Sequence, residues 1–251
     1  MPPEPFTPFG LTHLATVAVV LSVIGLAAWS GRRAGLARAK SGGRALGALL
    51  LVYYGVESWV RIAYLGVIPA HVLPFEICNA LFFIGAFALL TDHRVAHEIV
   101  FFWTFAATVH ALITPTPLEG WPSVEYVRYF AAHGLLVLVA VYAVVALDKT
   151  VTWWSFLRAA IALQVWEGIV ALVNLALDQN FMYLRRPPPS PTLIDALGPW
   201  PYYLLSLELI GLASFALWLG IHHAVRRVLP VRPAEPPEAP TGALEPARAP
   251  R

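Results

Sequence analysis

Cysteine is almost missing from this chain, with Cys78 the single one among 251 residues. One thiol excludes an internal disulfide and any metal site built from several cysteines. Lysine is also scarce, and Lys40 and Lys149 both fall in predicted connections between apolar segments. A retinal protein needs a lysine inside the membrane for its Schiff base, so this seven-helix class is excluded.

Charged residues are scarce as well, at 13% of the chain, against roughly 25% in an average soluble domain. Hydrophobic residues make up 58% and the mean hydropathy is +0.66. Residues 11–29, 99–118 and 129–147 contain no Asp, Glu, Lys or Arg, and about 20 apolar residues suffice to cross a bilayer. The composition predicts a multi-pass membrane protein. We expect no nucleic-acid partner and no cofactor.

The pattern of apolar runs predicts an all-α membrane protein. No Lys or Arg precedes the first run, so a secretory signal peptide is not expected. We predict a short segment over residues 1–9, a membrane domain over 10–228 and a disordered, Pro- and Ala-rich tail over 229–251. The membrane domain is expected to be a seven-transmembrane helix bundle, with spans at 10–30, 44–65, 73–91, 95–114, 123–147, 152–177 and 199–226.

Basic residues are unevenly distributed between the two sets of connections. One set holds most of them, with a cluster in the first connection, over residues 31–44, and more near 94, 149–158 and 226–232. The other set holds few, namely Arg61, Arg128, Arg185 and Arg186. Because basic loops stay on the cytoplasmic side, we expect the N-terminus outside and the C-terminus inside, in a bacterial cytoplasmic membrane.

Polar side chains inside the predicted spans gather at one depth. An ionisable group in a bilayer is costly and suggests a functional site. Glu57 and Arg61 are four residues apart, so they share a helix face and can pair. We expect the inner half to hold little besides His222 and His223. The outer half instead receives polar groups from six spans, which predicts an outward-opening polar cavity: Glu57, Arg61, Cys78, His110, Arg128, His133, Gln164, Glu167, Asn174 and Glu208.

Cys78 lies at the start of the third predicted span, about one turn after Pro74. The positive end of a helix favours a thiolate, and a neighbouring imidazole favours it further. His133 is predicted at a compatible depth, and His110 is a competing candidate. The alternative for Cys78 is packing alone, since a free cysteine is often a small buried hydrophobe.

Several short motifs together resemble the YwaF-like integral membrane proteins. They are Leu73-Pro74 four residues before Cys78, Leu112-Ile113-Thr114-Pro115, Tyr129-Phe130 before His133-Gly134, and the segments 180–184 and 197–203. This family is similar to the eukaryotic transmembrane protein 164 group, and the match extends over about residues 10–228.

The resemblance implies a seven-helix fold and a lipid acyltransferase activity that acts on membrane phospholipids or lysophospholipids. It implies Cys78 and His133 as the catalytic pair. Relatives often carry a histidine two residues before the cysteine, where this chain has Glu76. Arg61 or Arg128 could then hold the lipid phosphate. Glu57, Glu167 or Glu208 could orient the histidine or an arginine.

Two other functions fit the same polar residues. A transporter or ligand-binding protein would use the outer cavity for a polar solute, with the carboxylates as proton sites. A zinc-dependent hydrolase would use His110, His133 and a carboxylate as ligands, although no helix carries a histidine-rich spacing that supports it. We expect no bound metal.

Overall fold

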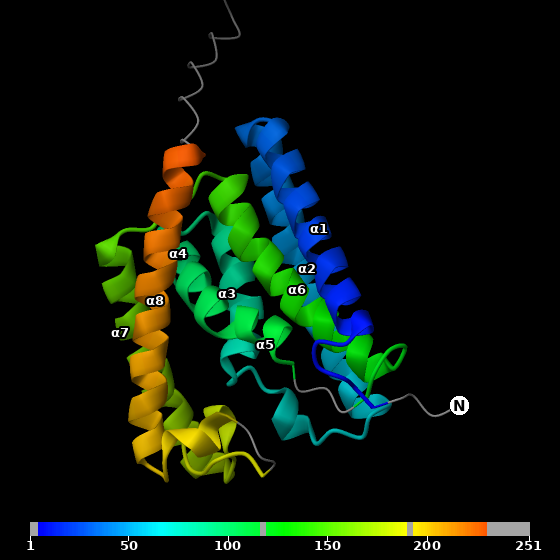
Figure 1. Ribbon diagram of the computed structural model, residues 1–251, viewed down its shortest axis with the longest axis vertical. Coiled ribbons are helices and arrows are strands. Elements are labelled where there is room, and N and C mark those ends of the chain that lie inside the picture. The colour runs from blue at the N-terminus through cyan, green and yellow to red at the C-terminus, as the bar shows by residue number, and fades with distance from the viewer. Residues whose placement is uncertain (1–4, 116–118, 190–192, 230–251) are drawn as a thin grey trace, which may run out of the picture.

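The computed structural model describes residues 5–115, 119–189 and 193–229. These residues form a bundle of helices (Figure 1), with one isolated bridge between Pro5 and Glu119 and no other strand pairing in the described ranges. The α-helices are α1 (Leu11–Arg33), α2 (Leu36–Ala63), α3 (Ile77–Thr91), α4 (Arg94–Trp103), α5 (Val109–Ile113), α6 (Val124–Val145), α7 (Trp153–Leu177) and α8 (Tyr202–Val228). A π-helical segment, Thr104–Thr108, joins α4 to α5 in one continuous rod.

The expected all-helical membrane fold is confirmed. Six helices are long and apolar enough to cross a membrane, namely α1, α2, the rod Arg94–Ile113, α6, α7 and α8. Helix α3 is apolar but has only 15 residues, which at 1.5 Å per residue gives about 22 Å. The chain is therefore a multi-pass membrane protein with six helices of spanning length and a shorter seventh. The seven-span count and the orientation stay predictions.

The third helix begins later than predicted. We expected it from residue 73, but it starts at Ile77. A 3₁₀ turn, Pro69–Val72, comes first, and Leu73 then has an extended backbone (φ −67°, ψ 147°). Proline disfavours a helical residue before it, which explains why the helix cannot begin ahead of Pro74.

The first connection is much shorter than predicted. Helix α1 continues to Arg33 and α2 already starts at Leu36, so most of the expected basic loop is helical. Ala, Leu, Arg and Lys are good helix formers, and the chain turns only at Gly35, whose φ is +85°. The segments that carry the basic side chains are helical, so α1 and α2 both continue beyond their apolar parts.

Tyr142 fixes the packing of α1, α2 and α6. Its hydroxyl donates to the carbonyl of Ala39 at 2.9 Å. A Cβ at Gly31 or at Gly42 would lie 2.6 Å from the nearest atom of the Tyr142 ring or hydroxyl. Only glycine fits at these two positions, so the phenol lies between α1 and α2.

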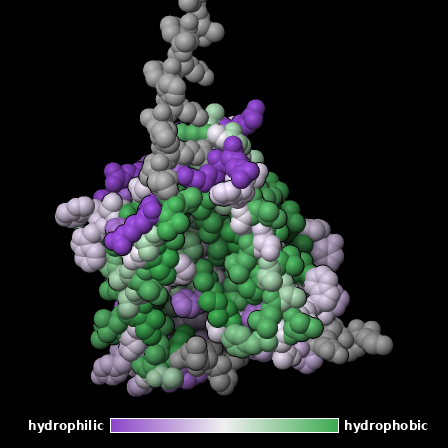
Figure 2. All heavy atoms as spheres, turned by 45° about the horizontal axis from the view of Figure 1, so that its top comes forward, coloured by the Kyte–Doolittle hydropathy of each residue, from purple (hydrophilic) through white to green (hydrophobic). Residues whose placement is uncertain are grey.

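The basic end is the end of the bundle where α1, α6 and α8 terminate and α2 and α7 begin. Figure 2 shows hydrophilic residues gathered near this end above a mostly hydrophobic surface. Asp148, just past α6, accepts from Arg32 at 2.9 Å and from Arg226 at 3.2 Å. One carboxylate just past the end of α6 thus joins α1 to α8.

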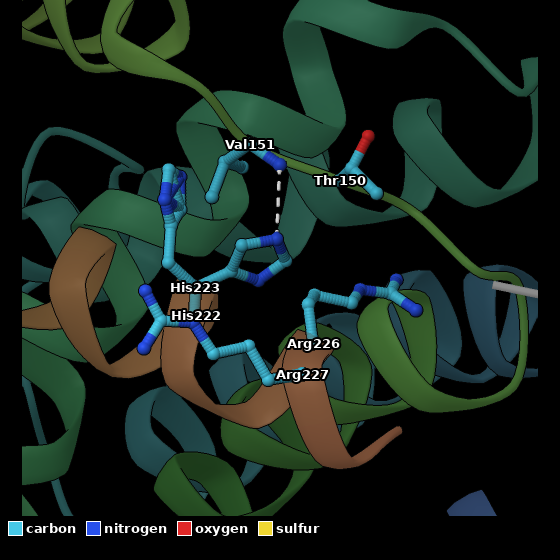
Figure 3. Close-up of a pocket in the computed structure, with 6 residues that line it drawn as sticks. All are labelled: Thr150, Val151, His222, His223, Arg226 and Arg227. Carbon is cyan, nitrogen blue, oxygen red and sulfur yellow. Dashed lines mark hydrogen bonds between the residues drawn. The ribbon is translucent and has the colours of Figure 1, made fainter. Parts of the chain in front are cut away.

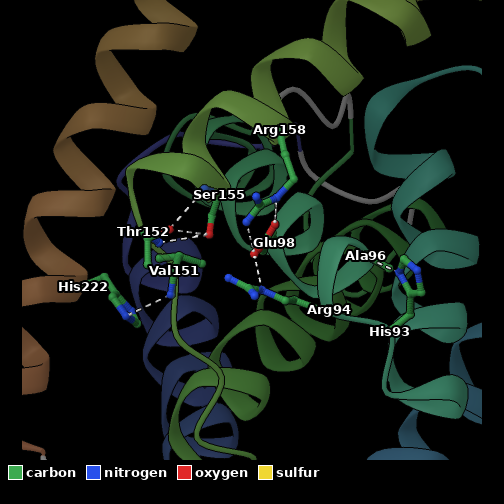
Figure 4. Close-up of polar contacts among 9 residues, drawn as sticks. All are labelled: His93, Arg94, Ala96, Glu98, Val151, Thr152, Ser155, Arg158 and His222. Atoms are coloured by element: carbon green, nitrogen blue, oxygen red, sulfur yellow. Dashed lines mark hydrogen bonds and ion pairs between the residues drawn. The ribbon is translucent and has the colours of Figure 1, made fainter.

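Two further acids lie at the basic end. Glu98 is 2% exposed and takes contacts at 2.6 and 2.7 Å from Arg158 and at 3.1 Å from Arg94 (Figure 4). Asp92 pairs with Lys40 at 3.1 Å and with Lys149. Burial opposes ionisation of Asp92, but hydrogen bonds from the two lysines outweigh it and hold its pKa below the ordinary value.

The expectation of an inner half nearly free of polar groups was wrong. Acids beside helix ends in the sequence look like solvated surface residues, and nothing in their local pattern distinguishes Glu98 or Asp148 from these. The structure shows that Glu98 contacts Arg158 of α7 besides Arg94 of its own helix, and that Asp148 contacts arginines of α1 and α8.

We predict that Asp148→Asn lowers the free energy of unfolding by about 3 kcal/mol, because removing one partner of a buried ion pair leaves the other charge uncompensated. The midpoint of thermal unfolding in detergent micelles measures this loss. Glu119→Gln, which removes an exposed carboxylate at the opposite end, is the control. Equal midpoints for the two variants would contradict a structural role for Asp148.

Candidate functional site

The π-helical segment Thr104–Thr108 lies next to Cys78. The Cys78 Sγ atom is 3.6 Å from the Thr108 hydroxyl, and either atom can be the donor. Thr108 is fully buried and Cys78 is half-buried at the first turn of α3. A π turn inside an α-helix is rare and is frequently found at functional sites. Thr108 was missed as a partner in the sequence, because a regular helix does not predict which way it faces.

His133 has a defined tautomer on α6. Its Nδ1 atom is 2.8 Å from the carbonyl oxygen of Tyr129. A carbonyl only accepts, so Nδ1 carries the proton and Nε2 is the basic nitrogen of the neutral ring. The ring also packs on Tyr129, with 4.2 Å between centroids. This arrangement presents Nε2 as a proton acceptor.

The two predicted catalytic residues lie on neighbouring elements. The π-helical segment packs against both α3 and α6, and the Tyr129 hydroxyl donates to the carbonyl of Ala111 on α5 at 3.1 Å. The Cys78 thiol contacts Thr108, while His133 contacts Tyr129. The pairing of Cys78 with His133 stays a prediction.

Glu57, Arg61 and Arg128 come together between α2 and α6. The Glu57 carboxylate accepts from Arg128 Nη1 at 3.0 Å, and it lies 3.7 Å from Arg61 Nε. The predicted Glu57–Arg61 pair is confirmed as an ion pair, although it is longer than a hydrogen bond. The Nε atoms of both arginines are buried and have no hydrogen-bond partner among the described residues. Two cationic groups therefore retain free donors.

Glu76 links α3 to a distant loop. Its carboxylate accepts the backbone N–H of Met182 at 3.1 Å. Met182 has a left-handed backbone with φ +56°, which turns its N–H toward the acid. Phe75 packs on Phe181 with 5.4 Å between ring centroids. Glu76 thus holds this loop against the start of α3.

Asn174 is an anchor for the same loop. It is fully buried on α7, donates to the carbonyl of Phe181 at 3.0 Å and accepts the Phe181 N–H at 2.8 Å. Arg185 donates to the Asn174 carbonyl at 3.1 Å and to Asp178 at 2.8 Å, which lowers the pKa of Asp178. The amide predicted as a supporting group therefore has all its contacts within this loop.

The two motifs of the family resemblance meet in this loop. The Tyr203 hydroxyl donates to the carbonyl of Tyr183, and Trp200 Nε1 donates to that of Leu184 at 3.0 Å. Segments 180–184 and 197–203 thereby form one cap over the end of the bundle opposite the basic end. The tail beyond residue 229 lies outside the described residues.

No polar contact joins the other candidates to Cys78 in the described part of the chain. Glu167 on α7 and Glu208 on α8 influence each other electrostatically, and Gln164 donates to Glu167 at 3.4 Å. His110 is exposed in the first turn of α5. Among the described residues no three His, Cys, Asp or Glu side chains are grouped to hold a metal ion, so the zinc alternative finds no ligand set there.

We predict that Asn174→Leu loosens the cap, because the N–H and carbonyl of Phe181 lose their partners at a cost of about 2 kcal/mol. Hydrogen exchange of the amides over residues 180–185 should become faster, while exchange in α6 stays unchanged. Gln164→Leu, about three turns earlier on the same helix, is the matched control. Unchanged exchange in the Asn174 variant would show that the cap does not depend on this amide.

Comparison with known families agrees with this geometry. The model of the TMEM164 family matches residues 8–219, which include Cys78, His133 and the cap. Comparisons with curated proteins and with solved structures gave no match. The family match covers most of the 251 residues and confirms the resemblance predicted from the motifs, so this chain belongs to the TMEM164 family.

Proposed function

We propose that this protein is a membrane acyltransferase that moves an acyl chain between a phospholipid and a lysophospholipid through Cys78 and His133. The observation that carries the proposal is the fixed tautomer of His133, whose Nδ1–H is held by the Tyr129 carbonyl. That bond leaves Nε2 ready to accept a proton, which is the role of the base in Cys–His catalysis. A bacterial cytoplasmic membrane is the proposed location.

The proposed reaction has two balanced steps. In the first, His133 Nε2 takes the thiol proton and Cys78 Sγ attacks the ester carbonyl of a phospholipid. The ester C–O bond breaks, His133 returns the proton to the leaving lysophospholipid oxygen, and a thioester remains on Cys78. In the second, His133 takes the proton of an acceptor hydroxyl, the new ester forms, the C–S bond breaks, and the proton returns to the thiolate.

Thr108 is proposed as a positioning residue for the thiolate. Its hydroxyl lies 3.6 Å from Cys78 Sγ. A hydroxyl that donates to a charged acceptor favours the charged form. Because Thr108 is fully buried, its donor is held in place by packing and does not exchange with solvent.

Arg61 and Arg128 are proposed to hold the lipid phosphate. Each has a buried Nε–H without a partner in the described part of the chain, and a guanidinium suits phosphate geometry. Both also attract Glu57, so their side chains are already oriented before a lipid arrives. Arg61 is near enough to influence Glu76 electrostatically, which places it close to the start of α3.

A transporter is the second candidate, and one observation favours it. Glu167 and Glu208 are electrostatic neighbours between α7 and α8. Two neighbouring carboxyl groups disfavour double ionisation, so one of them can carry a proton, and carboxyl groups inside a membrane serve as proton sites in carriers. A thiol-reactive acyl probe distinguishes the two functions, because the enzyme should be labelled at Cys78 and a carrier should not.

We predict that Cys78→Ala and His133→Ala each reduce acyl transfer at least 100-fold, since both act on the reacting atoms. Transfer of a labelled acyl chain to lysophospholipid by purified protein in vesicles is the measurement. His110→Ala, which changes the exposed competing histidine, should keep activity within twofold. Full activity of the Cys78 variant would refute the proposed function.

A further inference from the structure

A buried histidine at the basic end has an unused donor. His222 on α8 is 4% exposed, and its Nε2 accepts the backbone N–H of Val151 at 3.3 Å (Figure 3). A backbone N–H only donates, so Nε2 is unprotonated and Nδ1 carries the hydrogen in the neutral ring. Nδ1 is buried and has no hydrogen-bond partner among the described residues. Such a donor is costly to leave unsatisfied.

One turn further along α8, Arg226 has a second unused donor. Its Nη1 donates to Asp148 at 3.2 Å, and its Nη2 donates to the carbonyls of Val144 and Lys149 at 2.9 and 2.7 Å. These bonds fix the guanidinium, and its Nε is buried without a partner in the described ranges.

The two residues that carry these donors line one pocket. It has a volume of about 390 Å³ and is lined by Thr150, Val151, His222, His223, Arg226 and Arg227. Figure 3 shows the four side chains of α8 beside the segment that connects α6 to α7. The size is within the range of small-ligand sites.

The pocket has a positive charge that its own acids do not cancel. Arg226 and the exposed Arg227 are both cationic. The Asp148 carboxylate that contacts Arg226 is shared with Arg32. Basic residues in the last turn of a helix also offset its dipole, but that effect does not account for two buried N–H groups without acceptors.

We propose that this pocket binds a negatively charged phosphate group, whose oxygens accept from His222 Nδ1–H and Arg226 Nε–H and are paired in charge with Arg227. The basic end is where lipid headgroups meet the bundle, so the phosphodiester of an anionic phospholipid is one source and free phosphate is the other. The site lies at the end of the bundle opposite Cys78 and does not depend on acyl transfer.

The test is native mass spectrometry of the full chain, purified in detergent and titrated with phosphatidylglycerol. Wild type should retain one phosphatidylglycerol molecule, and Arg227→Ala and His222→Phe should each weaken its binding about tenfold. Arg38→Ala, at an exposed basic residue of α2 at the same end, should stay within twofold. Zwitterionic phosphatidylcholine should bind all four proteins equally.

A second arm adds inorganic phosphate to the wild-type complex. Displacement of phosphatidylglycerol would identify free phosphate as a ligand of the site, and retention would identify the lipid headgroup. His222→Phe also removes the acceptor of the Val151 N–H and can unfold the protein for that reason. Arg227→Ala removes no such contact, so its binding result decides the test if the His222 variant unfolds. Wild-type binding by Arg227→Ala, or an equal loss in Arg38→Ala, would overturn the proposal, because diffuse charge would then explain the affinity.

Discussion

The carboxylate of Asp148 is the contact on which the assembly of this bundle depends. It receives arginines from α1 and α8, and Arg226 also closes the carbonyls at the end of α6. A helix end in or near a bilayer has little water to satisfy its carbonyls. Arg226 therefore satisfies backbone groups and an acid at once, which holds the last helix to the rest of the bundle.

At the opposite end of the bundle, side-chain amide and carboxylate groups satisfy the polar backbone groups. Asn174 satisfies both polar groups of Phe181, and Glu76 takes the N–H of Met182. The cap built in this way lies against the first turn of α3, where Cys78 stands. The loop that a sequence shows as irregular is thus held against Phe75 and Glu76, directly before α3.

Helix positions were predictable because long apolar runs have few alternatives in a membrane protein. Boundaries failed where a local rule competed with hydropathy, as at Pro74, which delays α3, and at Gly35, which alone ends α1. The Glu57–Arg61 pair followed from helical spacing. The Arg158–Glu98 contact and the two contacts of Asp148 did not, because these arginines come from other helices, and spacing along one helix carries no information on them. Thr108 was missed for a related reason, since the direction of its side chain depends on the backbone geometry of the helix.

The π turn sets the direction in which the Thr108 side chain points. A regular α-helix advances about 100° per residue, whereas a π turn bonds each carbonyl one residue further on and so takes up an extra residue without lengthening the rod. The side chains before and after the π turn in the rod Arg94–Ile113 therefore point in directions that a regular α-helix would not combine. Before the turn Glu98 points toward Arg158, and at its end Thr108 points toward Cys78. Deleting one residue from Thr104–Thr108 would restore a regular α-helix and rotate either Glu98 or Thr108 away from its partner. The surroundings of the thiol thus depend on residue count within the rod as much as on residue identity.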